Sequence, residues 1–298
     1  MIRSSADRPV LPSDVPTAVL RRAHLLAAGA TGRQITDAVR DGRLLRLRRD
    51  HYLPRDTDPQ VCAAVQWGGR LDCVSLLRLL GVFVRERAGL HIQLAPDASR
   101  TPRPEASTEI VRHWRPTSSA ADDVLVPVRE ALCAAVRCQR PRDAVATLDS
   151  AWHLGAVDED GLADVFAHVP GRYRSLRPLL DQRAEAGTET LVRLMLRSLG
   201  CHVDLQVRID GVGRVDLLVD GWLVIECDSR SHHGSWGDHK RDRRRDAAAI
   251  GLGFTTLRLL AEDILFRPEW VIEVLRRAVA RGPRTTPRTV RVHNSGEL

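Results

Sequence analysis

Carboxylates interrupt two apolar runs in the last third of the chain, and their positions carry the clearest chemical information in the sequence. Asp216 lies within the run 214–219 (RVDLLV), and Glu226 lies within the run 222–228 (WLVIECD). An ionised carboxylate inside buried β-structure has to be paired with a cation or bound to a metal, because its desolvation is costly. Asp228 follows Glu226 by two residues and is therefore expected on the same side of its strand.

Three carboxylates from two neighbouring strands would converge at one edge of a sheet. Hard oxygen ligands of this kind suit Mg²⁺, or Mn²⁺. A metal held by Asp216 and Glu226 would activate a bound water and would stabilise developing negative charge. The alternative is that each of the three acids forms a separate ion pair with a nearby arginine.

The elements that would hold these acids follow one another in the order αβββαβα. A helix is predicted with Thr188 as its cap, Glu189 in its first turn and Gly200 as its stop. Extended runs are predicted at 202–209, 214–219 and 222–228, a charged helix at about 238–250, a strand at 254–259 and a helix opened by Pro268. This order predicts a mixed α/β fold, α+β over the whole chain.

The same stretch, from Thr188 to Gly282, contains Arg-Val-Asp-Leu-Leu, Val-Ile-Glu-Cys-Asp, a His-His pair, Asp-Arg-Arg-Arg-Asp and Leu-Arg-Leu. It resembles the family of small PD-(D/E)XK domains related to very-short-patch repair endonucleases. The resemblance implies a restriction-endonuclease-like core and a Mg²⁺-dependent endodeoxyribonuclease. It further implies a metal site made by Asp216, Glu226 and the backbone carbonyl of Cys227, with further site residues Glu189, His232 and His233.

The sequence departs from that family at one position, because Asp228 stands where the motif has its lysine. An acid cannot stabilise a negatively charged transition state, so two replacements are considered. The cation could come from the following helix, as Lys240, Arg241, Arg244 or Arg245, or Asp228 could hold a second metal. Lys240 is the only lysine of the chain, which makes it a candidate catalytic residue.

The metal site requires Asp216 and Glu226 to lie on the same face of two antiparallel strands. A two-residue turn at 220–221 would pair Val219 with Trp222 and place the two acids on opposite faces. We therefore predict a three-residue loop, 220–222, with Gly221 at positive φ, or a β-bulge between the two acids.

The first 60 residues carry a second pattern of helix, turn, helix and basic strand. An apolar pattern from Pro16 to Gly29 predicts one helix, and Thr31 with Gln34 forms a capping box for a second one ending before Gly42. The run 44–53 then alternates apolar and basic residues as a strand or wing would. This order is typical of a winged helix-turn-helix.

In that fold, basic side chains would contact phosphates and polar ones would reach base edges. The candidate phosphate contacts are Arg33, Arg40, Arg43, Arg46, Arg48 and Arg49, with Arg244 and Arg245 in the C-terminal part. Gln34 and Thr36 are the candidate base contacts. The alternative for the N-terminal arginines is a basic face exposed to solvent.

The N-terminal pattern also resembles the N-terminal region of AbiEi-type antitoxins and related regulators. The resemblance rests on Gly29-x-Thr31, Gly42-Arg43-Leu44 and a basic stretch that ends in Tyr52, over about 40 residues. This chain has Asp50 where such proteins more often have the glycine of an Arg-Gly-x-Tyr turn. The resemblance implies a rival function, a non-enzymatic transcriptional regulator or antitoxin whose nuclease-like domain is inactive.

Composition favours a polyanionic partner. The net charge is +7, the isoelectric point is about 9.6, and nearly all of the positive charge is arginine. We expect DNA as the partner, most readily duplex, with RNA also open, and either a homodimer or a toxin-like protein partner. No apolar run approaches the roughly 18 residues of a membrane helix, and the polar start favours a cytoplasmic protein.

The chain is long enough for more than one folded unit. We predict a winged helix-turn-helix at 1–60, a helix-rich connector at 61–185, the nuclease-like domain at 186–282 and a flexible tail at 283–298. The six cysteines show no metal-ligand spacing and are interpreted as core residues. The scattered histidines of the connector, His91, His113, His153 and His168, are interpreted as structural.

Overall fold

The computed structural model describes residues 16–85, 89–98, 109–228, 236–283 and 292–293. Contacts divide the chain into unit 1, Met1–Ala144 with Leu154–Arg177, and unit 2, Val145–His153 with Pro178–Leu298. The described part is mixed α/β, as predicted, and contains three sheets. The four-part domain division stays a prediction. Within the described residues, no helix combines the length and apolar character that crossing a bilayer requires.

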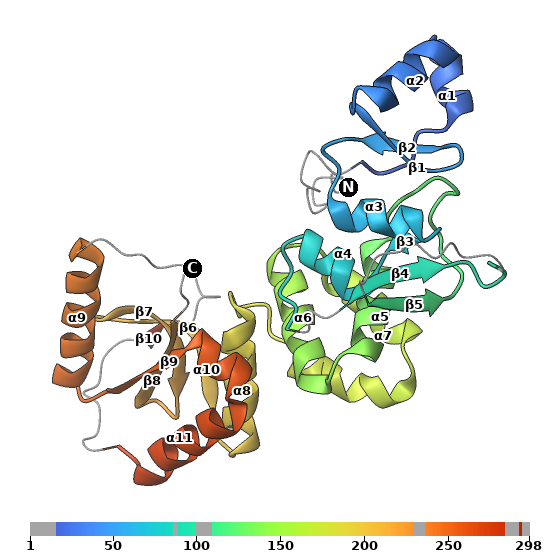
Figure 1. The fold of residues 1–298 in the computed structure, drawn as a ribbon. Helices are drawn as coiled ribbons and strands as arrows, with labels where there is room; N and C mark the ends of the chain where they lie inside the picture. Colours follow the sequence, from blue (N-terminus) through green and yellow to red (C-terminus); the bar gives the residue numbers. More distant parts are fainter. Residues whose placement is uncertain (1–15, 86–88, 99–108, 229–235, 284–291, 294–298) are drawn as a thin grey trace, which may run out of the picture. The chain divides into compact units, whose positions relative to one another are not determined.

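Unit 1 begins with two short helices and a hairpin (Figure 1). These elements are α1 (Arg22–Ala27), α2 (Gly32–Arg40), β1 (Leu44–Arg48) and β2 (His51–Pro54). The predicted capping box is confirmed, because Gln34 N donates to Thr31 Oγ1 at 3.2 Å and Thr31 N donates to Gln34 Oε1 at 2.7 Å. At the hairpin turn, Asp50 adopts φ 62°, and its carboxylate accepts the N–H of Arg22 at 2.7 Å. That bond offsets the strain of a left-handed residue where glycine would be easier.

The first helix is shorter than predicted, since it begins at Arg22 and not near Pro16. The preceding residues are extended and pair with distant segments. Leu20 exchanges both backbone hydrogen bonds with Tyr52, at 2.9 and 3.0 Å, and Val19 N donates to Asp122 O at 2.8 Å. Long-range strand pairing therefore replaces the helical turn that local apolar spacing favoured.

The rest of unit 1 is a small sheet with helices packed on it. Its elements are α3 (Pro59–Gln66), β3 (Arg70–Leu71), α4 (Cys73–Leu79), β4 (Leu90–Leu94), β5 (Ile110–Trp114), α5 (Val128–Cys138) and α7 (Glu159–His168). Strand β4 lies between β3, antiparallel, and β5, parallel. Helices α3 and α4 contact the sheet, α5 packs on α4, and α7 packs on α5. The extended segments predicted at 90–94 and 110–114 are confirmed.

Helix α6 (Pro141–His153) contributes to both units, and a 3₁₀ helix, η1 (Gly171–Leu179), precedes the elements of unit 2. Unit 2 then contains α8 (Gly187–Ser198), β6 (Val203–Ile209), β7 (Gly213–Val219), β8 (Leu223–Asp228), α9 (Trp236–Gly251), β9 (Thr255–Leu260), α10 (Ala261–Phe266), α11 (Pro268–Arg281) and β10 (Val292–His293). The predicted order αβββαβα is present, with α10 as an additional short helix before α11. Residues 292–293 of the predicted tail pair with β6.

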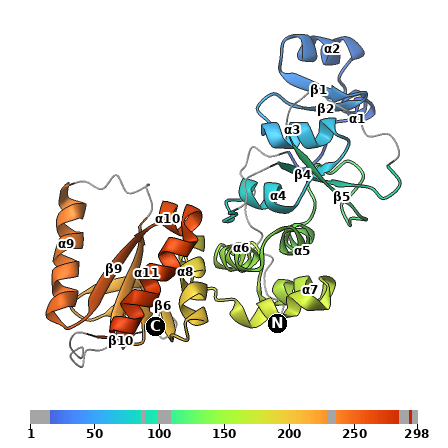
Figure 2. The same cartoon turned by 60° about the horizontal axis from the view of Figure 1, so that its bottom comes forward.

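The unit 2 sheet has the strand order β10-β6-β7-β8-β9, antiparallel except for the parallel pair β8 and β9. Helix α9 covers one face, and α8, α10 and α11 cover the other (Figures 1 and 2). On the α9 side, Ala249 and Phe254 join a buried cluster of strand residues. The cluster comprises Val207, Ile209, Val212, Val215, Leu218, Val224, Ala249 and Phe254.

A buried polar network fixes α8, the helix that carries Glu189. Asp149 of α6 accepts hydrogen bonds from Thr190 Oγ1 at 2.8 Å and Arg193 Nη2 at 2.7 Å. The Arg193 side chain is fully buried and also donates to the carbonyl of Leu179 at 2.8 Å. The predicted Thr188 cap is wrong, because the N-cap of α8 is Ala186, two residues earlier, and Thr188 is buried within the helix.

Candidate active site

The predicted acids of unit 2 come from three elements around one part of the sheet. Glu189 lies in the first turn of α8, Asp216 lies in β7, and Glu226 and Asp228 lie in the last part of β8. Gln206 of β6 lies beside these acids, because its side chain contacts Glu189. The geometry of each acid follows from the register of these strands.

The loop between β7 and β8 has the predicted length. Val219 pairs with Leu223, Leu218 with Val224 and Leu217 with Ile225, which leaves residues 220–222 as a three-residue loop. Gly221 has φ 74°, as expected, and Asp220 is also left-handed at φ 47°. The predicted three-residue loop with Gly221 at positive φ is confirmed, and continuing this register by one pair would set Asp216 opposite Glu226.

Regular pairing of β7 and β8 stops at Leu217 and Ile225. Beyond this pair, the side chain of Asp216 makes the next hydrogen bond between the two strands. Its Oδ2 atom accepts the backbone N–H of Cys227 at 2.8 Å. Burial raises the pKa of Asp216, the Cys227 N–H opposes that shift, and the charge of Asp228 adds to it. The bond orients the carboxylate of Asp216 at the point where β8 carries its own two acids.

Glu189 is nearly inaccessible to solvent, with 4% of its surface exposed. Its Oε2 atom accepts two hydrogen bonds, from Gln206 Nε2 at 2.9 Å and from the backbone N–H of Glu185 at 3.0 Å. Gln206 itself has φ 53°, a left-handed conformation inside β6. Burial raises the pKa of Glu189 to about 7, and the charge of Asp216 adds to the rise.

Glu226 is paired with a cation from α9. Arg245 Nη2 lies 3.1 Å from Glu226 Oε1 and also donates to the backbone carbonyl of Arg214. Burial raises the pKa of Glu226 to about 7, the charge of Asp216 adds to this, and the positive charge of Arg245 opposes it. The helix after β8 therefore does bring a cation to the acids, Arg245.

Asp228 is held by an arginine of the neighbouring strand. Arg258 donates to both oxygens, from Nε at 2.9 Å and from Nη2 at 3.3 Å. The same guanidinium contacts Asp246 at 3.2 Å and Asp242 at 3.7 Å on α9. Two of the three strand acids thus have the arginine partners that the ion-pair alternative expects.

The other predicted site residues of unit 2 are placed as follows. Lys240 is exposed on α9, at roughly 200° around the helix from Asp242, which faces Arg258. Arg244 is also exposed. His232 and His233 lie outside the described residues, as does the side chain of Arg241.

In unit 1, nearly all of the predicted nucleic-acid contacts are exposed, and only Arg48 is partly buried; the exposed residues are Arg33, Gln34, Thr36, Arg40, Arg43, Arg46 and Arg49. Some of these side chains also make contacts within unit 1. Gln34 completes the capping box, and Thr36 Oγ1 donates to the carbonyl of Gly32 at 2.9 Å. Arg48 lies against Gly68, whose added Cβ would meet Arg48 Nη1 at 2.6 Å.

Sequence reasoning missed one group of chemically active side chains. Cys73, His91, His113 and Cys138 have ligand atoms that all lie within 4.8 Å of one another in unit 1. In the described part of the chain, the acids of unit 2 form no group of three that is as close. Successive members of the Cys/His group are 18, 22 and 25 positions apart in the sequence, so no short sequence motif indicates the group.

Comparison with known proteins adds no assignment: the chain matches no protein-family model and no curated protein.

Proposed function

We propose that this protein binds DNA and hydrolyses phosphodiester bonds with a divalent metal, Mg²⁺ or Mn²⁺, in a restriction-endonuclease-like unit 2. The observation that carries the proposal is the β7–β8 register, which continued by one pair would set Asp216 opposite Glu226, with buried Glu189 nearby. Burial and neighbouring negative charge raise the pKa of all three acids. A cation bound among the three acids would reduce the repulsion between their negative charges. Acids with such perturbed pKa values are typical of functional sites.

In this proposal, Asp216 and Glu226 hold the metal together with the Cys227 carbonyl. The bound metal supplies an activated water and charge stabilisation for the departing oxygen. Arg245 takes the place of the missing motif lysine as the cation at Glu226. Because its guanidinium does not deprotonate, Arg245 stabilises negative charge and does not act as a base.

Asp228 has a positioning role in this scheme. Its bidentate contact with Arg258 neutralises its charge, and Arg258 connects it to Asp242 and Asp246 of α9. This connection ties α9 to the edge where β8 and β9 end. Helix α9 in turn supplies Arg245, so Asp228 acts on the site through the placement of that helix.

The N-terminal part of unit 1 is proposed as a winged helix-turn-helix that holds duplex DNA. Support comes from the order of α1, α2 and the β1–β2 hairpin, and from the exposed arginines, including Arg46 and Arg49 near the hairpin tip. Phosphate contacts of this kind position a protein on DNA without selecting a sequence.

A second candidate function is a non-enzymatic DNA-binding regulator that uses unit 2 as a scaffold. The arginine partners of Glu226 and Asp228 favour it, because an ion pair neutralises a carboxylate without any metal. The acid at the motif lysine position also favours it.

A cleavage assay separates the two functions. The full chain is incubated with supercoiled plasmid, single-stranded DNA or RNA, with and without Mg²⁺ or Mn²⁺. We expect metal-dependent cleavage that Asp216→Asn lowers by about 100-fold or more, a loss of the size seen when a transition-state stabiliser is removed. Asn keeps an oxygen for the Cys227 N–H, so the fold is retained.

Asp210→Asn is the matched control, because Asp210 is an exposed acid of the β6–β7 turn. It should leave cleavage unchanged. If the wild-type protein binds DNA but cleaves none of the substrates with either metal, the regulator is the correct function. Equal activity of wild type and Asp216→Asn would remove the proposed site.

A further inference from the structure

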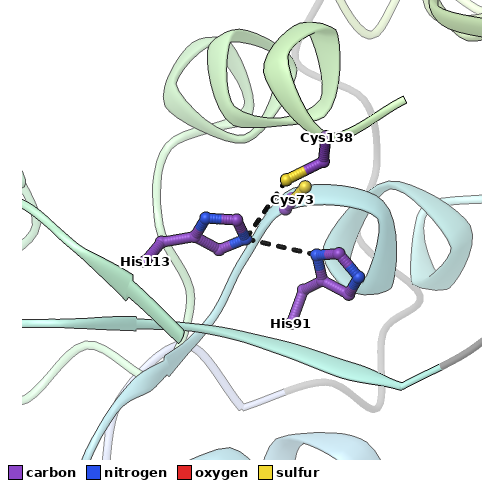
Figure 3. Close-up of side chains that lie close together, drawn as sticks. All are labelled: Cys73, His91, His113 and Cys138. Atoms are coloured by element: carbon purple, nitrogen blue, oxygen red, sulfur yellow. Dashed lines mark hydrogen bonds between the residues drawn. The ribbon is translucent and has the colours of Figure 1, made fainter. Parts of the chain in front are cut away.

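Four elements of unit 1 bring two thiols and two imidazoles together (Figure 3). Cys73 is the first residue of α4, His91 lies in β4, His113 lies in β5, and Cys138 is the last residue of α5. Strands β4 and β5 are parallel, with Gln93 opposite His113. Since His91 and Gln93 are two residues apart, both histidines project from the same face of the sheet.

The separations match the edges of a tetrahedral metal site. His91 Nδ1 lies 3.2 Å from His113 Nε2, and His113 Nε2 lies 3.9 Å from Cys138 Sγ. Zn–N bonds of ~2.0–2.1 Å and Zn–S bonds of ~2.3 Å give tetrahedral edges of ~3.3 Å between nitrogens and ~3.6 Å between nitrogen and sulfur. All four ligand atoms lie within 4.8 Å of one another. A small contraction would complete the tetrahedron.

The backbone around the ligands is fixed by bonds that do not involve the ligand atoms. Asp72 N donates to the carbonyl of His91 at 3.0 Å, and His91 N donates to Ser75 Oγ at 3.0 Å. The buried carboxylate of Asp72 accepts from Arg115 at 2.9 and 3.0 Å. Arg115 follows His113 by two residues. The segments that carry Cys73, His91 and His113 are thus connected to one another around the cluster.

Cys73 itself has a strained backbone. Its φ is 52°, a left-handed conformation that a residue with a side chain rarely adopts, and its N–H donates to Asp72 Oδ1 at 2.7 Å. Such strain is unfavourable and persists where surrounding structure imposes it, often at ligand sites. The strained residue is therefore one of the two that would supply a thiol to the cluster.

We propose that Cys73, His91, His113 and Cys138 form a structural Zn²⁺ site in unit 1. Four protein ligands fill a tetrahedral zinc and leave no position for water, which is the arrangement of structural sites. Two thiolates neutralise the charge of the ion, so the complete site is neutral and can lie among residues as buried as Cys73 and His91. The ion would connect α4, β4, β5 and α5. This inference does not depend on the nuclease proposal.

Zinc content of the full chain tests the proposal. Protein purified without chelators should contain about one zinc per chain, the stoichiometry of a single closed site. Cys138→Ser should lower zinc affinity by more than the ~10–100-fold that loss of an outer-shell partner costs. Cys133→Ser, on the same helix and outside the cluster, should retain the metal. Equal zinc content in the two variants would overturn the assignment.

Cobalt spectroscopy keeps the test decisive if a variant fails to fold. Co²⁺ added to zinc-stripped wild-type protein should give the intense visible bands of a tetrahedral ion and a thiolate-to-cobalt charge-transfer band. The charge-transfer band distinguishes this site from binding to the acids of unit 2. A weak spectrum of octahedral Co²⁺, or a Cys73–Cys138 disulfide in freshly purified protein, would contradict the proposal.

Discussion

At the scale of single residues, the arginines next to the acids separate the two candidate functions. Arg245 pairs with Glu226, and Arg258 contacts both oxygens of Asp228. In a nuclease, Arg245 would stabilise the charge that develops on the phosphate, while in a regulator both pairs would only neutralise the charges of the two acids. Glu189 differs from these acids, since neutral donors hold its carboxylate, the Gln206 amide and a backbone N–H.

Glu189 should make the stability of the metal-free protein depend on pH. Its pKa of about 7 lies above the ordinary value of 4.5, so the folded state binds its proton more tightly than the unfolded state. The resulting stabilisation is complete below about pH 4.5 and is lost as the pH rises through about 7. At ~1.4 kcal/mol per pKa unit, the loss is on the order of 3 kcal/mol.

Denaturant unfolding of Glu189→Gln at pH 5 and pH 8, without added divalent metal, measures this effect. The glutamine carbonyl still accepts from Gln206 and Glu185 N, so the variant should gain stability over wild type at pH 8 and show a smaller fall between the two pH values. Glu269→Gln, an exposed acid of α11, serves as the control and should follow wild type. If Glu189→Gln also follows wild type, the buried acid does not titrate in this range.

At the scale of elements, the site depends on one short loop and one anchored helix. The three-residue loop 220–222 sets which residues of β7 and β8 face each other. Helix α8 is fixed by the buried pair of Asp149 and Arg193. Removing one partner of such a pair leaves a buried charge and typically costs about 3–5 kcal/mol. The position of Glu189 therefore depends on an ion pair made one turn further along its helix.

The loop yields a prediction about its glycine. Gly221 has φ 74°, and a Cβ added there would meet no atom within 4 Å, so Gly221→Ala meets backbone strain alone. We expect a loss of about 1–2 kcal/mol in the free energy of unfolding, the cost of a left-handed conformation for a residue with a side chain. Thermal or denaturant unfolding measures it.

The matched control is Gly251→Ala at the end of α9, where the added methyl group also has open space and φ is not left-handed. That variant should be neutral or slightly more stable, because alanine narrows the unfolded ensemble. An equal loss of stability in both variants would mean that the left-handed conformation of Gly221 is not the cause of the loss.

At the scale of the whole molecule, the excess of arginine favours a polyanionic partner, and most of that excess lies in unit 1. The chain carries a net charge of +7. In unit 1 the exposed arginines of the hairpin are the proposed contacts, whereas Arg48 packs against the end of α3 at Gly68. The nucleic-acid surface is therefore smaller than the basic residues of the sequence alone suggest.

Binding of the full chain to duplex DNA should weaken steeply with salt, because pairing a phosphate with arginine releases counterions. The double variant Arg46→Ala/Arg49→Ala should bind all sequences more weakly and reduce the salt slope by about 1 for each arginine that paired with a phosphate. Arg140→Ala/Arg142→Ala removes two other exposed arginines of the chain and should bind like wild type. Fluorescence anisotropy at several salt concentrations gives the slopes. Equal weakening in both double variants would indicate a general effect of net charge.

The sequence by itself determined most elements of unit 2 and one decisive detail of their pairing. Apolar runs and glycine turns are local features, and they predicted strands β6 to β9. The requirement that Asp216 and Glu226 lie on the same face of the sheet predicted the three-residue loop at 220–222. The first helix of unit 1 was predicted too long, because the pairing of Leu20 with Tyr52 joins residues 32 positions apart. Local spacing carries no information about such a partner.

Only the tertiary structure decided which side chains meet. It paired Asp228 with Arg258 across two strands, and it placed Arg245 of α9 on Glu226. It also assembled Cys73, His91, His113 and Cys138 from four separate elements. Helical and strand periodicity fixes the direction of a side chain within its own element, but contacts between elements depend on how their faces pack. For this reason the acids could be found in the sequence, whereas their cations and the Cys/His cluster could not.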